Sequence, residues 1–164
     1  DTKAPRGLGD IDGVNTIAAG AKIISLDPFV DAIYAASKAG GATLNAFIVS
    51  PDDGLAIAKI KEKDGSNRAL LQSDPTKGDP TTEAGSVTPA ATIAGVPMWI
   101  PPACPKGTIW GIPKDSVVVA LRKDLEVTKN DSVYYTSDVT AVRALARVTT
   151  VFGHPAAIQK ITIG

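Results

Sequence analysis

The sequence predicts an α+β fold in which helices flank a mixed sheet and long β-strands follow near the end of the chain. Two helix starts stand in the amino-terminal half, at Asp27-Pro28 and Ser50-Pro51. Short apolar runs separated by Gly, Pro and Asp occupy the carboxy-terminal half, which is typical of strands joined by turns. With 164 residues, of which 44% are apolar, the chain is long enough to bury roughly 70% of its unfolded surface and to form a core.

The first helix is expected after residues 1–20, an irregular Gly-rich segment with at most one short strand. Asp27 is expected to cap the free backbone amides, and Pro28 suits the first helical position because the amide that it lacks would have no partner there. Gly40 and Gly41 end the helix. The residues predicted to form its apolar face are Phe29, Val30, Ile33 and Ala36, with Tyr34 at the edge.

A short buried strand, residues 44–49, leads directly into a second helix. Ser50 and Pro51 repeat the start signal, and the acidic pair Asp52 and Asp53 favours the positive end of the helix dipole. Three lysines crowd the far end of this helix, and its apolar contacts are expected from Leu55, Ile57 and Ile60. The lysines are Lys59, Lys61 and Lys63. Helix, strand and helix in this order indicate a layered beginning.

Residues 72–91 have no period and are dominated by Asp, Pro, Thr, Gly and Ser, so they predict a long exposed loop of a functional or mobile kind. Strands are then expected at residues 96–101, 108–112, 116–121, 125–128, 139–152 and 157–163. The longest strand alternates, with Arg143 and Arg147 on one face. Its other face is apolar or small and comprises Val142, Ala144, Ala146, Val148, Thr150 and Phe152.

Composition excludes several classes of function. Seventeen basic and seventeen acidic side chains balance, and no run of like charge occurs, so dedicated nucleic-acid binding is not expected. The single cysteine, Cys104, excludes an internal disulfide framework and is interpreted as a small apolar filler. No apolar run is long enough to span a membrane, and no signal-peptide pattern opens the chain.

Catalytic motifs are also missing. His154 is the sole histidine and stands between two expected strands, where a turn or surface role is the plainer interpretation. No nucleophile elbow occurs, and the acidic pairs are explained by helix capping and a solvated face. Asp10-Ile11-Asp12-Gly13 resembles the start of a calcium loop, but Ala21 stands where that loop needs a Glu. The residues therefore predict no catalytic, cofactor-binding or metal site and no cofactor.

An ordered series of short motifs runs through the chain. Its carboxy-terminal members are Thr92-Ile93-Ala94-Gly95-Val96-Pro97, Gly107-Thr108-Ile109-Trp110-Gly111-Ile112-Pro113-Lys114-Asp115, Arg122-Lys123-Asp124, Tyr135-Thr136-Ser137-Asp138, Ala141-Val142-Arg143-Ala144 and His154-Pro155-Ala156-Ala157-Ile158. Gly7-Leu8, Gly13-Val14 and Ser50-Pro51-Asp52 precede them. In this order the motifs resemble the major capsid protein family of tailed bacteriophages, over essentially the whole chain.

The resemblance implies a division into two domains. Residues 1–22 would enter from the P-domain, residues 23–121 would form the A-domain around the capsomer axis, residues 122–152 would form long P-domain β-strands, and residues 153–164 would form the final A-domain strand. The family's amino-terminal arm, extended loop and spine helix are missing, so Asp1 is expected to mark a truncation or a proteolytic product.

The function implied is that of a structural subunit of an icosahedral phage or prophage capsid, not an enzyme. Its expected partners are copies of itself in pentamers and hexamers, scaffolding or decoration proteins, and packaged DNA through weak nonspecific contact, with no membrane. The expected location is the virion, assembled in the bacterial host cytoplasm. An encapsulin-like shell that encloses cargo enzymes is the alternative, and a small hydrolase or ligand-binding domain with residues 72–91 as a lid is the rival from another class.

Three finer expectations follow from the resemblance. The loop of residues 72–91 would lie at a symmetry axis of the shell. The apolar strip of Val142, Ala144, Ala146 and Val148 would pack against the missing spine helix. The isopeptide cross-links of some family members would be absent, because Asp138 stands at the acceptor position and Leu145 where a buried Glu would act as the base.

Overall fold

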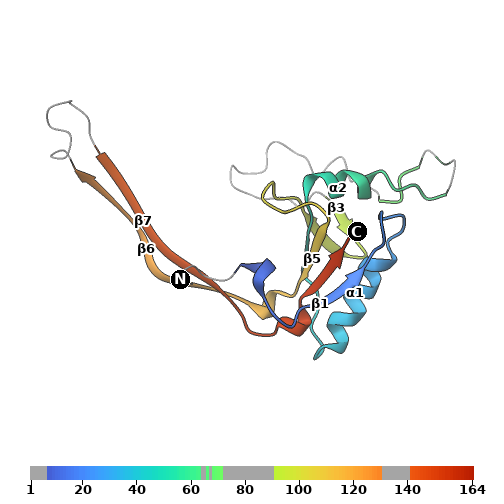
Figure 1. Ribbon diagram of the computed structural model, residues 1–164, viewed down its shortest axis with the longest axis horizontal. Coiled ribbons are helices and arrows are strands. Elements are labelled where there is room, and N and C mark those ends of the chain that lie inside the picture. The colour runs from blue at the N-terminus through green and yellow to red at the C-terminus, as the bar shows by residue number, and fades with distance from the viewer. Residues whose placement is uncertain (1–6, 64–65, 67, 72–90, 131–140) are drawn as a thin grey trace. The chain divides into compact units, whose positions relative to one another are not determined.

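The computed structural model describes residues 7–63, 66, 68–71, 91–130 and 141–164 (Figure 1). Contacts divide the chain into two compact units. The larger, which we call the sheet unit, comprises Asp12–Ser116 and His154–Gly164, and the smaller, the ribbon unit, contains the described parts of Asp1–Ile11 and Val117–Gly153. Most of the predicted loop of residues 72–91, together with Asp138, lies outside the described residues.

The sheet unit is built on a six-stranded mixed sheet with the strand order β1-β8-β5-β2-β4-β3. Its strands are β1 (Asn15–Ala18), β2 (Ala46–Ile48), β3 (Ala91–Ile93), β4 (Val96–Trp99), β5 (Thr108–Ile112) and β8 (Gln159–Thr162). β1 runs parallel to β8 and β2 parallel to β4, whereas the other neighbours are antiparallel. The mixed sheet of an α+β fold, predicted from the sequence, is therefore confirmed.

Two α-helices flank this sheet, α1 (Asp27–Lys38) and α2 (Pro51–Ala58), and both begin where the sequence predicts. The cap of α1 differs from the prediction, because Asp27 lies inside the helix. The Oγ of Ser25 accepts a hydrogen bond from the backbone N–H of Asp27 at 3.4 Å. At α2 the predicted chemistry is found, since the Oγ of Ser50 accepts the backbone N–H of Asp53 at 3.2 Å. Short 3-10 turns lie at Leu8–Asp10, Lys114–Ser116 and Pro155–Ala157.

The core lies between the helices and the sheet. Phe29 of α1 and Phe47 of β2 are fully buried and meet edge to face, with ring centroids 5.1 Å apart. Such a buried aromatic side chain contributes roughly 1.5 to 3 kcal/mol relative to an exposed one. Two positions placed on apolar helix faces by the sequence pattern are instead exposed, Val30 at 38% and Leu55 at 56%, because the buried stripe of each helix is narrower than the apolar pattern.

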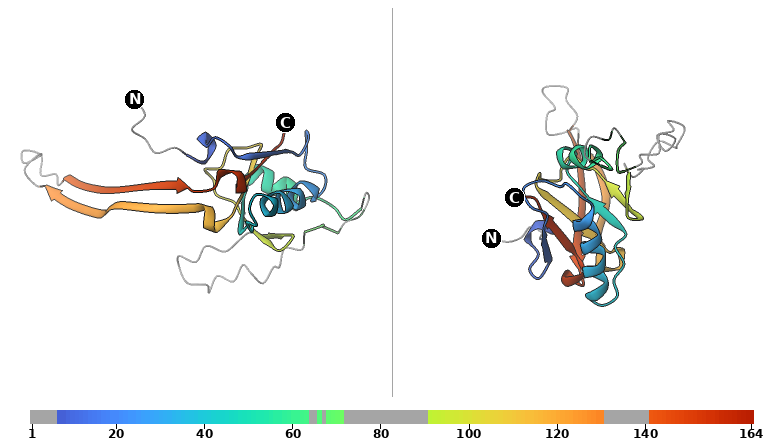
Figure 2. Two further views of the ribbon diagram at one scale, coloured as in Figure 1. Left: turned by 90° about the horizontal axis from the view of Figure 1, so that it is seen from below. Right: turned by 90° about the vertical axis from the view of Figure 1, so that its right-hand side faces the viewer.

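The ribbon unit contains β6 (Val117–Asn130) and β7 (Ala141–Phe152), which pair antiparallel as a two-stranded sheet. Figure 2 shows the two strands running side by side. The prediction of two strands at 116–121 and 125–128 is wrong, since β6 is continuous through Arg122-Lys123-Asp124. The polar residues that suggested a turn are absorbed by register shifts between Leu121 and Lys123 and between Lys123 and Glu126.

The contact division falls after residues 11, 116 and 153, whereas the boundaries expected from the resemblance fall after residues 22, 121 and 152. Residues 15–18 pair with β8 inside the sheet unit. The assignment of the two units to an A-domain and a P-domain remains a prediction.

Candidate assembly surface

One face of the β6–β7 ribbon is apolar over most of its length, with Lys129 opposite Val142 near one end. Residues directly opposite each other in an antiparallel pair share a face. The pairs Val119 with Thr150, Leu121 with Val148 and Val127 with Ala144 therefore lie on the same side. We call this side the apolar face. Five of its apolar side chains are exposed: Val119 by 64%, Leu121 by 58%, Val127 by 61%, Val142 by 67% and Val148 by 49%.

The other side, the charged face, has a different composition. Lys123 lies opposite Arg147, Glu126 opposite Leu145, and Thr128 opposite Arg143. Lys123 and Glu126 form an ion pair. Except for Arg147, these side chains line a shallow hollow of about 190 Å³. The ribbon is therefore amphipathic over residues 121–128 of β6, although the charged face also includes the exposed apolar pair Val118 and Val151.

An amphipathic ribbon of two strands needs a covering partner. A lone two-stranded hairpin is at best marginally stable in water, and open strand edges favour pairing with another chain. In the part of the chain that is described, β6 and β7 hydrogen-bond only to each other. At about 25 cal/mol per Å², covering one half-exposed Val or Leu contributes roughly 1 kcal/mol. The apolar face is thus suited to be buried by a second apolar surface.

His154, the one histidine, supports the fold locally. Its Nε2 atom lies 2.6 Å from the carbonyl oxygen of Ala39, just after the end of α1. A carbonyl at the end of a helix has no partner within the helix, so this contact satisfies it. Among the residues that the structure describes, no three His, Cys, Asp or Glu side chains gather as a metal site would require.

Asp53 joins α2 to the loop before β5. Its side chain is buried, and its Oδ2 atom accepts the hydroxyl of Ser50 at 2.7 Å and the backbone N–H of Gly107 at 2.8 Å. Cys104 lies in the same loop, with its Sγ atom 3.7 Å from the carbonyl oxygen of Thr108. Burial raises the pKa of the Cys104 thiol, and the Asp53 carboxylate raises it further. A thiol whose pKa is raised is a poorer nucleophile at neutral pH.

Sequence reasoning identified half of the apolar face. The strip on β7 was predicted from its alternation, whereas Val119, Leu121 and Val127 on β6 were not joined to it. Residues 117–121 are a continuous apolar run, so the sequence does not show which of them share a face. The run stops at residues 122–124, and only the register with β7 shows that Val127 returns to the same face.

Comparison with known proteins gives one family and several solved structures of similar fold. A family model described as "Phage capsid family" matches residues 1–163. No curated protein matches the chain. In the described residues, no helix is long and apolar enough to cross a membrane.

Three solved structures illustrate the shared fold. The capsid of a native GTA particle, computed with C5 symmetry, is 22% identical with a TM-score of 0.64, over 99% of this chain and 54% of that one. Gordonia phage Cozz is 17% identical with a TM-score of 0.60, over 98% and 52%. A virus-like particle from Pyrococcus furiosus is 15% identical with a TM-score of 0.60, over 94% and 58%. The chain thus spans little more than half the length of the structures that it matches.

Proposed function

Because this chain belongs to the phage capsid family, we propose that it is part of a structural subunit of an icosahedral phage or prophage shell. Copies of the subunit assemble into pentamers and hexamers that enclose the genome. The observation that supports this proposal most is the exposed apolar face of the ribbon, with Leu121 and Val127 more than half exposed. Such a face is expected on a subunit that becomes more stable when assembly buries it.

The two units suit different tasks in such a shell. The sheet unit has its own buried core and corresponds to the A-domain that surrounds the capsomer axis. The ribbon unit corresponds to the P-domain, whose strands gain partners when further parts of the shell cover them. Scaffolding or decoration proteins are further partners, and packaged DNA makes weak nonspecific contacts because the chain has no net charge. The subunit resides in the virion and is assembled in the host cytoplasm.

We also propose that the subunit has no enzymatic activity. The acidic pair Asp52 and Asp53 is engaged at the start of α2, with Asp53 buried against Gly107 and Asp52 3.6 Å from the amine of Lys106. His154 is engaged at the end of α1. These polar groups do not converge on one cavity, as a hydrolase or ligand-binding site would require.

The alternative of an encapsulin-like shell enclosing cargo enzymes is supported by the likeness to the virus-like particle from Pyrococcus furiosus. The phage capsid reading is favoured over it, because the family model is that of phage capsids and the similar structures include GTA and phage capsids.

The experiment is to purify the complete protein of which this chain is part and to examine it by sedimentation velocity and negative-stain electron microscopy. We expect closed shells of uniform diameter. A protein that stays monomeric or dimeric at every concentration tested would contradict the proposal, and shells that copurify with an enzyme in place of nucleic acid would favour the encapsulin alternative.

A further inference from the structure

The outer face of α1 combines apolar and acidic side chains. Asp27, Asp31 and Tyr34 follow each other at helical spacing and are all exposed, with Tyr34 at 66%. Val30, exposed by 38%, lies beside them. In the described residues, the side chain of Asp31 forms no ion pair or hydrogen bond. We call these four residues the acidic helix face.

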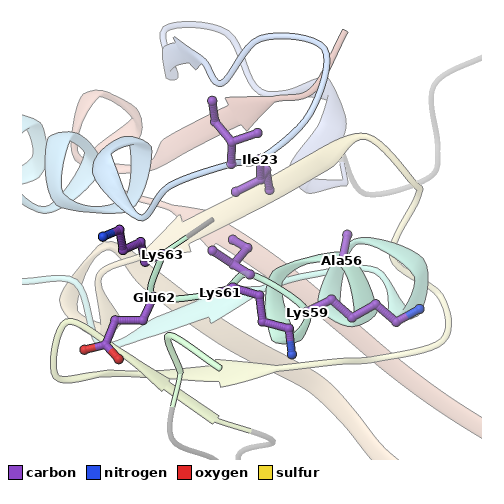
Figure 3. A pocket seen from close by; sticks show the side chains of 8 residues that line it. Ile23, Ala56, Lys59, Lys61, Glu62 and Lys63 are labelled. Atoms are coloured by element: carbon purple, nitrogen blue, oxygen red, sulfur yellow. The ribbon is translucent and has the colours of Figure 1, made fainter. Parts of the chain in front are cut away.

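A hollow of about 500 Å³ lies at the far end of α2 and has the complementary composition. Its apolar part comes from Ile24, which is 82% exposed, and from Ile23 and Ile60, which are buried. Lysines form much of the rest, and Figure 3 shows Lys59 and Lys61 extending from the α2 side, with Lys63 on the opposite side of the hollow and the Glu62 carboxylate pointing away. We call it the lysine hollow; the lysines that line it are Lys59, Lys61 and Lys63.

Two of the three lysine charges in the hollow have no ion-pair partner in the described part of the chain. Glu62 is engaged with Arg68 at 3.7 Å, and Lys59 and Lys63 have no ion pair among the described residues. The carboxy-terminal end of α2, where the helix dipole is negative, also lies here. This partial charge favours the nearby lysines but does not neutralise them. A ligand for this hollow must bring apolar surface and carboxylates together.

We propose that the acidic helix face of one subunit docks into the lysine hollow of a second copy of this chain. Both surfaces are exposed, and each offers what the other lacks. Ile24 would receive the apolar side chains of Val30 and Tyr34, while Lys59 and Lys63 face Asp27 and Asp31. Complementary charges around an apolar centre steer association and select the partner.

The contact joins two different patches, so it is a heterologous contact, and such contacts close into rings when the rotation between copies allows it. The inference rests on the proposed shell function, because rings of subunits are what a capsomer requires. It goes beyond that function by naming the two surfaces that meet.

A charge exchange in the complete protein tests the contact. Asp31→Lys and Lys63→Glu are chosen because neither residue begins or ends a helix. Each substitution alone is expected to raise the protein concentration needed for assembly about tenfold, because it replaces an exposed ion pair with a repulsion between like charges. The double variant with both changes restores the attraction and is expected to assemble within about twofold of the wild type.

Matched controls are Lys114→Glu and Asp115→Lys, which reverse exposed charges elsewhere on the sheet unit. Circular dichroism confirms that each variant is folded, and Tyr34→Ser and Ile24→Ser test the apolar part without a change of charge. Single variants that assemble like the controls, or a double variant no better than either single, would overturn the inference while leaving the shell intact. A wild-type protein that never associates would contradict the shell function as well.

Discussion

Asp53 is the buried residue on which the start of α2 and the loop before β5 both depend. Replacing it with Ala leaves the hydroxyl of Ser50 and the N–H of Gly107 without their acceptor. An unsatisfied buried donor costs about 1 to 3 kcal/mol, so we expect Asp53→Ala to lower the free energy of unfolding by that amount. The neighbouring Asp52→Ala is the control, because Asp52 is exposed and its substitution should change stability by less than about 0.5 kcal/mol. Equal effects in urea denaturation would refute this role of Asp53.

The residue that caps a helix could be predicted from the sequence only where no neighbouring side chain competes for the same backbone amide. Ser50 caps α2 as its position before Pro51 predicts. Asp27 has the same position before Pro28, yet Ser25 supplies the hydroxyl that accepts its amide. The exposure of Val30 was not predictable, because it depends on how α1 meets β1 and β8 rather than on the helix alone.

At the scale of elements, the apolar face of the ribbon leads to a prediction about assembly. Leu121 and Val148 are a cross-strand pair on this face. Replacing both with Ser removes roughly 2 kcal/mol of the free energy gained by burying them, which lowers an association constant about 30-fold. We expect the complete protein with both changes to need a correspondingly higher concentration to form shells, as measured by light scattering.

The matched control is Val118→Ser with Val151→Ser, the cross-strand pair on the charged face with similar exposure. The control pair should assemble like the wild type, and both double variants should keep the thermal transition of the sheet unit. If the control pair impairs assembly as much as the Leu121 and Val148 pair, the apolar face is not the surface that the shell buries.

Helices and short strands were predictable because their signals lie within a few residues of sequence. The continuity of β6 was not, since Arg122, Lys123 and Asp124 have the composition of a turn and only pairing with β7 holds them in a strand. The order of strands in the sheet was equally inaccessible from the residues alone. It joins β1 to β8 across almost the whole chain, and nothing local in either strand specifies that partner.

At the scale of the whole molecule, the proposed shell is expected to lack covalent cross-links between subunits. Leu145 takes the position where the resemblance calls for a buried Glu. The carboxylate opposite it, Glu126, is half exposed and paired with Lys123, so it does not replace that buried base. Loss of a general base commonly slows a reaction by about 10² to 10⁴. Boiled mature particles should therefore run as a monomer band on a denaturing gel, whereas a ladder of oligomers that resists reductant would contradict this prediction.

The central claim is that this chain is a structural shell subunit that buries the apolar face of its ribbon upon assembly. A cryo-electron microscopy reconstruction of particles formed by the complete protein tests it most directly. We expect an icosahedral shell in which Leu121, Val127 and Val148 are covered by another part of the shell, with residues 72–91 near a symmetry axis as the resemblance implies. A reconstruction in which the apolar face remains open to solvent, or a preparation that forms no closed particle, would contradict the account.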